Sequence, residues 1–168
     1  MFDFLLLLLF PAVMAFAGAM DLLTMTIPNR VSISLAALFV VLAPLAGFSG
    51  TAFIQHLGAG ALVLLVCFLM FARGWIGGGD AKLLAAAALW LGFAHLPAFL
   101  MQVAILGGVL AVAILAYRQF VPMGALPGPA WALRLHERGR GIPYGVAISG
   151  AAMLIYPSTP WFAAFAAS

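Results

Sequence analysis

Six apolar runs, separated by short polar segments, make up most of this chain of 168 residues. The runs cover residues 4–20, 31–47, 53–72, 81–93, 97–117 and 146–165. A transmembrane α-helix needs roughly 20 such residues. Apolar residues make up 67% of the chain and charged residues 7%, which is too little charge to cover a soluble domain. The sequence therefore predicts an all-α polytopic membrane protein, a single domain over residues 1–168 with about six transmembrane helices.

The basic residues predict how these spans are oriented. With six spans both termini lie on one side of the membrane, and all seven Lys and Arg residues fall in loops on the other side. Because cytosolic loops are enriched in Lys and Arg, that side is the cytosol and the termini are periplasmic. The longest cytosolic loop covers residues 118–141, and residues 131–138 within it have the pattern of a short interfacial helix. The bases form no continuous stripe, so nucleic-acid binding is not expected.

Two of the four acids are brought to the same face by this topology. Asp21 ends the first span and Asp80 begins the fourth, which places both at the cytosolic interface. Asp3 belongs to the opposite face, and Glu137 lies among arginines of the longest loop. A carboxylate near membrane depth is costly and by default marks a functional site. The alternative is that each acid only caps a helix end, which suits Asp80 better than Asp21 because an acid at a helix C-terminus opposes the helix dipole.

Three glycines, Gly77, Gly78 and Gly79, come directly before Asp80. Glycine allows close approach to the backbone, and a segment without side chains gives an extended peptide a surface to lie against. A protease needs such a surface beside its catalytic group. The alternative interpretation is a flexible loop with no such role.

The segments around both acids resemble the type IV prepilin peptidases. GGGD at 77–80 matches the GxGD signature of membrane-embedded aspartyl proteases. Asp21 followed by IPN at 27–29, GGGDAKL at 77–83 and PYG at 143–145 follow the family in order and spacing. The resemblance implies an aspartyl endopeptidase with Asp21 and Asp80 as catalytic residues, without a metal or other cofactor. It also implies that the cleft between them is shaped by Gly77, Gly78, Gly79, Lys82, Pro28, Asn29, Pro143, Tyr144 and Gly145.

Within that resemblance, the supporting residues have alternative roles. Lys82 either tunes Asp80 or orients its loop, or is a plain surface lysine. Asn29 is expected to hydrogen-bond backbone near the site, after a turn fixed by Pro28. Pro143 and Tyr144 shape the cleft at the entry to the last span, although a tyrosine there also suits the aromatic belt of a membrane interface.

The same resemblance implies the substrate and its location. The substrate is a prepilin or pilin-like precursor, in which a short and often basic leader precedes an apolar helix, and it is cut at the cytosolic face of the inner membrane. The chain is similar to the short, peptidase-only members that serve Tad (Flp) pili, so N-methyltransferase activity is not expected. The two carboxylates would hold one proton between them and activate a water molecule.

Other classes of function fit the sequence less well. A zinc metalloprotease would need a motif such as H-E-x-x-H, which the sequence does not contain. A small proton-coupled transporter is the main alternative, because it also uses intramembrane acids, but those acids lie near the midplane and often in repeated halves. A non-catalytic membrane subunit is the third possibility, and it gives no reason for GGGD.

Overall fold

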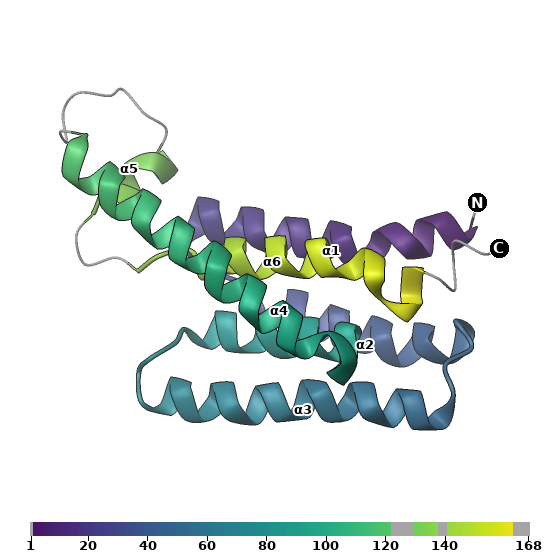
Figure 1. Cartoon of the computed structure of the whole chain (residues 1–168). Helices are drawn as coiled ribbons and strands as arrows, with labels where there is room; N and C mark the ends of the chain where they lie inside the picture. Colours follow the sequence, from purple (N-terminus) through teal and green to yellow (C-terminus); the bar gives the residue numbers. More distant parts are fainter. Residues whose placement is uncertain (1, 122–129, 138–140, 163–168) are drawn as a thin grey trace.

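A computed structural model describes residues 2–121, 130–137 and 141–162, and over these residues it is helical with no strand (Figure 1). This confirms the all-α prediction. Three helices, α1, α3 and α4, are long and apolar enough to cross a membrane, and α2 is a shorter apolar helix. The elements are α1 (Phe2–Thr24), α2 (Asn29–Leu45), α3 (Gly50–Ala72), α4 (Gly78–Phe120), α5 (Ala130–His136), α6 (Tyr144–Ile155) and a 3₁₀ turn (Tyr156–Ser158).

Helix α4 consists of two limbs that meet at Gly92. This glycine has φ 71° and ψ 174°, which lies far from helical values, and it separates a first limb over 78–91 from a second limb over 93–120. The ribbon of α4 turns back at this break and runs toward α5 (Figure 1). The sequence placed the break at residues 94–96 instead, and this was wrong. The chain reverses at Gly92 because glycine adopts positive φ without a steric penalty, whereas Pro97 lies inside the second limb.

The two limbs of α4 bring the number of apolar helical segments to six in the described residues, and these segments alternate in direction. The first limb runs antiparallel to α3, and α6 runs antiparallel to both α1 and the second limb. The contacts that fix these directions join Phe71 to Gly78, Gly60 to Leu89, Asp21 to Gly145, Phe10 to Tyr156, Gly107 to Tyr144 and His95 to Ser158. The alternation agrees with the predicted order of runs, while six membrane crossings and periplasmic termini stay a prediction.

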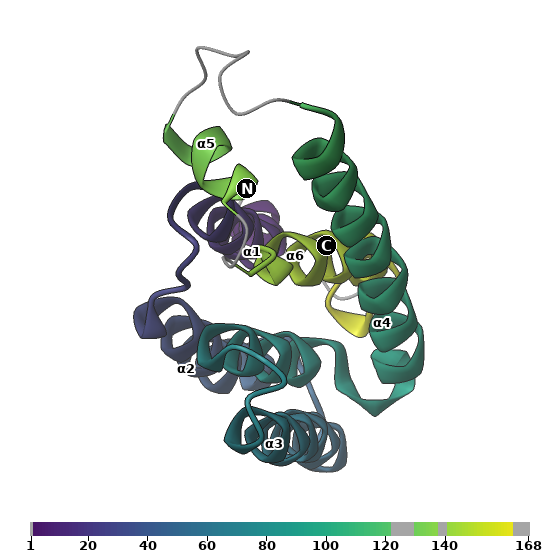
Figure 2. The ribbon, with the colours of Figure 1, turned by 90° about the vertical axis from the view of Figure 1, so that its left-hand side faces the viewer.

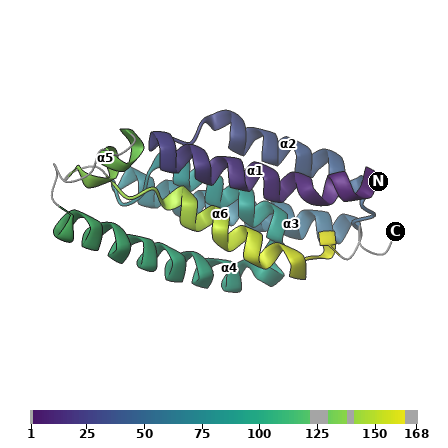
Figure 3. The ribbon, with the colours of Figure 1, turned by 90° about the horizontal axis from the view of Figure 1, so that it is seen from above.

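This alternation gives the bundle two different ends. The links 25–28 and 73–77 and the segment 141–143 lie together at one end, here called the linker end. The link 46–49 and the break at Gly92 lie at the other, here called the aromatic end. In Figure 2 the helices α2 and α3 lie on one side of the bundle, and α1, α6 and the second limb of α4 on the other. In Figure 3 α6 lies between α1 and the second limb.

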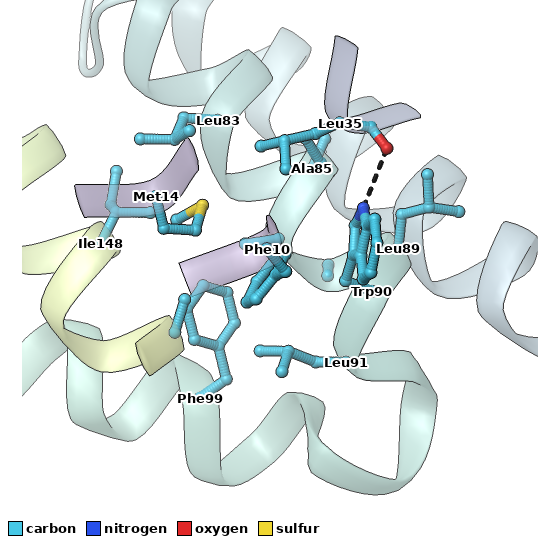
Figure 4. Packing of buried hydrophobic residues seen from close by; sticks show 14 of the residues in the cluster. Phe10, Met14, Leu35, Leu83, Ala85, Leu89, Trp90, Leu91, Phe99 and Ile148 are labelled. Atoms are coloured by element: carbon cyan, nitrogen blue, oxygen red, sulfur yellow. Dashed lines mark hydrogen bonds between the residues drawn. The ribbon is translucent and has the colours of Figure 1, made fainter. Parts of the chain in front are cut away.

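Buried rings fill the aromatic end. Phe10 and Trp90 stack with 5.0 Å between their ring centroids, and Trp161 lies 4.6 Å from Trp90. The indole N–H of Trp90 donates to the carbonyl of Leu35 at 2.9 Å (Figure 4). The indole N–H of Trp161 donates to the carbonyl of Trp90, also at 2.9 Å. Buried indoles need such acceptors. The cluster therefore packs α2, α4 and the segment around Trp161 against one another.

Two predicted helices end earlier than the sequence suggested. The last span was expected over 146–165, but α6 stops at Ile155 and a 3₁₀ turn follows. Pro157 explains the stop, because proline has no N–H to continue the helical hydrogen bonds. The interfacial helix expected over 131–138 is α5, which ends at His136. Residues 163–165 and the bases Arg138 and Arg140 lie outside the described residues.

Candidate active site

Asp21 lies in the last turn of α1 and is buried, with 5% of its surface exposed. Its Oδ2 accepts a hydrogen bond of 2.7 Å from the backbone N–H of Gly145, the second residue of α6. A Cβ on Gly145 would lie 2.8 Å from that oxygen, closer than real Cβ atoms come. Position 145 is therefore restricted to glycine, and its N–H fixes one oxygen of the carboxylate in place.

Asp80 lies in the first turn of α4 and is half-buried. A negative charge is favourable there, because the N–H groups of a helix N-terminus carry partial positive charge. A Cβ on Gly77 would lie 3.0 Å from Asp80 Oδ2. Of the three glycines, Gly77 alone faces this carboxylate, whereas Gly78 and Gly79 begin α4 and face Phe71 and Ile27.

The two acids line one cleft at the linker end. The cleft has a volume of about 1010 Å³, and the two carboxylates are close enough to interact electrostatically. Helices α1, α3, α4 and α6 and both segments 74–77 and 141–142 contribute to its walls. The structure thus brings together the acids that topology predicted at one face. The lining residues are Asp21, Met25, Met70, Gly74, Trp75, Ile76, Gly77, Asp80, Leu84, Val103, Arg118, Gly141, Ile142, Tyr144 and Ile148.

The buried side chain of Ile27 lies between the backbone segments that adjoin Asp80 and bind Asp21. A Cβ on Gly79 would lie 3.2 Å from Ile27 Cβ, and a Cβ on Gly145 would lie 2.8 Å from Ile27 Cδ1. Gly79 adjoins Asp80 in the chain, and Gly145 donates to Asp21. Ile27 therefore fits between two backbone segments that approach it closely because they carry no side chain. The sequence singled out both glycines but did not show that they contact the same residue.

Pro28, Asn29 and Lys82 lie beside the cleft rather than on its lining. Pro28 precedes α2 in an extended conformation, as expected for a residue that fixes the turn. Lys82 Nζ donates to Asn29 Oδ1 at 2.9 Å, which joins the start of α4 to the start of α2. Asn29 was expected to bind backbone, but its bond in the structure is to this lysine side chain.

Tyr144 lines the cleft, and Pro143 is fully buried next to it. The ring of Tyr144 packs on α4 at Gly107, where a Cβ would lie 2.5 Å from its Cε1. Tyr144 is 38% exposed, which is compatible with both roles considered for it. Its contact with Gly107 holds the start of α6 against the second limb of α4.

Most of the cleft lining, including Arg118, Met25 and Trp75, was not identified from the sequence as part of the site. Arg118 was used only to orient the spans, but its Nε donates to the carbonyl of Leu135 at 2.7 Å and its guanidinium also donates to that of Gly141 at 3.2 Å. It thereby ties α5 and the segment before α6 to the end of α4. Met25 and Trp75 are apolar residues of the cleft wall. Their only sequence signal is position, four residues after Asp21 and five before Asp80.

The described residues contain no group of three His, Cys, Asp or Glu side chains that could hold a metal ion. His56 is buried and contacts the carbonyl of Leu89, and His95 lies between the carbonyls of Leu91 and Ser158. Both histidines belong to the aromatic end, and neither lines the cleft. Cys67 is buried in α3 among apolar side chains. What the cleft offers chemically is a pair of carboxylates, which can accept and donate protons.

Comparison with known proteins identifies a family. The type IV leader peptidase family matches residues 8–112 of the chain, a region that contains Asp21, the IPN segment and GGGD. No curated protein and no solved structure matches the chain. The matched region ends before α6. The hydrogen bond from Gly145 to Asp21 therefore lies outside the family match and is found only in the structure.

Proposed function

The chain belongs to the type IV leader peptidase family, and we propose that it is an aspartic endopeptidase that removes the leader of a type IV prepilin. One observation carries this proposal. Asp21 and Asp80 are far apart in the sequence, yet both line the same cleft beside backbone that has no side chains. The alternative of two independent helix caps gives no reason for a shared cleft.

The mechanism follows from the chemistry of an amide and a carboxylate pair. Two carboxyl groups close together hold one proton between them and titrate as a pair. The ionised member takes a proton from water, and the oxygen of that water attacks the peptide carbonyl. The protonated member donates a hydrogen bond to the carbonyl oxygen. As the C–N bond breaks, a proton passes to the leaving nitrogen, so no covalent intermediate is needed.

The cleft has features that suit an extended peptide. Segment 74–77 forms one wall and segment 141–142 another, and both lie outside helices. Non-helical backbone presents N–H and C=O groups to which an extended peptide can bind. The walls are otherwise mostly apolar, which suits the apolar helix that follows the leader. Because the nearby loops are basic, they would not attract a basic leader, so recognition rests on the acids and these apolar contacts.

For the location, the proposal places the cleft at the cytosolic face of the inner membrane. Arg30, Arg73, Lys82, Arg118 and Arg134 all lie in or next to the links of the linker end. Cytosolic loops are enriched in such residues. The Tad (Flp) prepilins are the proposed precursors, because the resemblance of the sequence is to the peptidases of those pili.

The test is cleavage of candidate prepilins from the same genome by the purified protein, with the new N-terminus read by mass spectrometry. Asp21→Asn and Asp80→Asn are each expected to abolish cleavage while the protein still inserts and folds. Asp3→Asn and Glu137→Gln are matched controls, acids outside the cleft lining, and should cleave like the wild type. Cleavage by either cleft variant would refute the pair. Solute flux in proteoliposomes without proteolysis would favour the transporter.

A further inference from the structure

Met25 combines an unusual backbone with a position in the cleft. Its φ is 57°, and it is the one residue other than glycine with positive φ in the described part of the chain. Its N–H donates to the carbonyl of Asp21 at 2.8 Å, and it directly follows Thr24, the last residue of α1. Helices commonly end in this left-handed conformation, and glycine or asparagine is the usual residue there. Methionine is strained at such a position because its Cβ crowds the backbone.

The turn at this position is required by the site. The chain must leave α1 and bring Ile27 between Gly79 and Gly145 within two residues. A glycine at position 25 would make the same turn without strain. The turn therefore does not explain why a methionine is at this position. The reason must lie in the contacts that its side chain makes.

The side chain of Met25 lines the cleft four residues after Asp21. Met70, from the end of α3, lines the same cleft, as do Trp75 and Ile76 from the segment before the glycine run. These four residues come from three separate elements and form an apolar wall beside the carboxylates. Methionine is flexible and polarisable, so two of them can adapt to apolar groups of different shape.

We propose that Met25 is a specificity-determining residue, and that its side chain forms part of a subsite for an apolar substrate residue next to the scissile bond. This inference rests on the proposed function, since it deepens the description of the same cleft. Strained backbone persists at functional sites where the surroundings hold it in place. Here the packing of Ile27 holds the turn, and the strain accompanies a side chain that faces the substrate.

The two roles of Met25 give opposite effects in one variant. Met25→Gly relieves the strain, so the thermal unfolding midpoint in micelles is expected to rise. The same change removes subsite contacts, so KM is expected to rise about tenfold or more while kcat changes little, given the discrimination that apolar pocket contacts provide. Met25→Asn, which also tolerates positive φ, should behave in the same way. Met25→Leu keeps an apolar side chain and the strain, so its KM should rise less than that of Met25→Gly and its unfolding midpoint should not rise.

Peptide selectivity gives a second measurement. The probe is a synthetic precursor peptide with a basic leader and an apolar helix, made in versions with Ala, Leu or Phe on either side of the scissile bond. In Met25→Gly the larger subsite should raise the preference for Phe over Leu at one of these two positions. An unchanged KM together with an unchanged order of preference would overturn the proposal, and Met25 would then be part of the turn only.

The proposed function and this inference fail in different ways. If the wild-type protein cleaves no precursor, the proposed function fails and no subsite exists to be read. If the wild type cleaves, Asp80→Asn does not, and Met25→Gly is more stable with an unchanged KM and preference, only the subsite is wrong. If Met25→Gly loses stability instead, the strain argument fails, and the KM of Met25→Asn then decides whether the side chain still binds substrate.

Discussion

The two ends of the bundle are built in opposite ways. At the aromatic end large rings pack on one another, and their polar atoms are satisfied by carbonyls, as with Trp161 on Trp90. At the linker end glycines take the place of large side chains. Gly77 lines a cleft of about 1010 Å³, and Gly79 and Gly145 let their backbone approach Ile27 closely. The first limb of α4 joins the two ends, with Asp80 in its first turn and Trp90 near its last.

This difference separates two tasks. A packed cluster holds helices in place through many small contacts, and in a membrane such packing replaces much of the hydrophobic driving force. A site that must admit a peptide needs the reverse, an open space with groups held at fixed positions. The comparison predicts that changes at the aromatic end alter stability and leave cleavage intact, whereas changes at the linker end alter cleavage. Four substitutions test it.

The largest expected effect is on stability at the aromatic end. Trp161→Ala removes a fully buried ring and its hydrogen bond to Trp90, and should lower the free energy of unfolding by about 3–5 kcal/mol. Unfolding in mixed micelles measures this loss, and the activity per folded molecule should stay near that of the wild type. A selective loss of activity in the folded fraction would show that the two ends are not separate.

Gly145→Ala is the corresponding change at the linker end. The added methyl would lie 2.8 Å from both Asp21 Oδ2 and Ile27 Cδ1, so the carboxylate must move. We expect kcat/KM to fall on the order of 100-fold, the effect of displacing a catalytic group by about 1 Å. Gly108→Ala is the matched control, because the space around its Cβ is open and it does not line the cleft. Wild-type cleavage by Gly145→Ala would show that the bond from Gly145 does not position Asp21.

Gly92→Ala tests the break between the limbs of α4. Its φ of 71° is unfavourable for alanine, and the new Cβ would lie 2.7 Å from His56 Nε2. The unfavourable backbone conformation alone should lower the free energy of unfolding by about 1–2 kcal/mol. Gly108→Ala, in the same helix and in open space, should be neutral or slightly stabilising, since alanine favours helix. Equal stabilities of the two variants in thermal unfolding would argue against a hairpin at Gly92.

The smallest effect is expected for Lys82→Met. The bond from Lys82 to Asn29 is exposed, and such a bond contributes about 0.5–1.5 kcal/mol at most. Cleavage should change by no more than a few fold, because Lys82 does not line the cleft with Asp80. Measuring kcat/KM for Lys82→Met and Asn29→Ala side by side checks this. A loss as large as that of Asp80→Asn would place Lys82 in the chemistry after all.

The sequence was sufficient for the features that depend on order along the chain. Topology alone brought Asp21 and Asp80 to one face, and the glycine run indicated open backbone beside Asp80. It was not sufficient for features that depend on contacts between distant segments. The break of α4 was placed in the gap between the apolar runs 81–93 and 97–117, whereas the reversal needs the positive φ of Gly92, which lies inside an apolar run. Arg118 could not be assigned to the cleft, because its acceptors are backbone carbonyls that carry no sequence signal.

The contact of Ile27 with both glycines has a consequence for how the two acids keep their alignment. The backbone beside Asp80 and the backbone that binds Asp21 both touch this one side chain. Ile27 is thus a spacer, and the length and branching of its side chain set the separation of the two segments. A shift of α4 or α6 along its axis would change its contact with this isoleucine. The alignment of the acids is therefore a property of the link between α1 and α2, which contains neither of them.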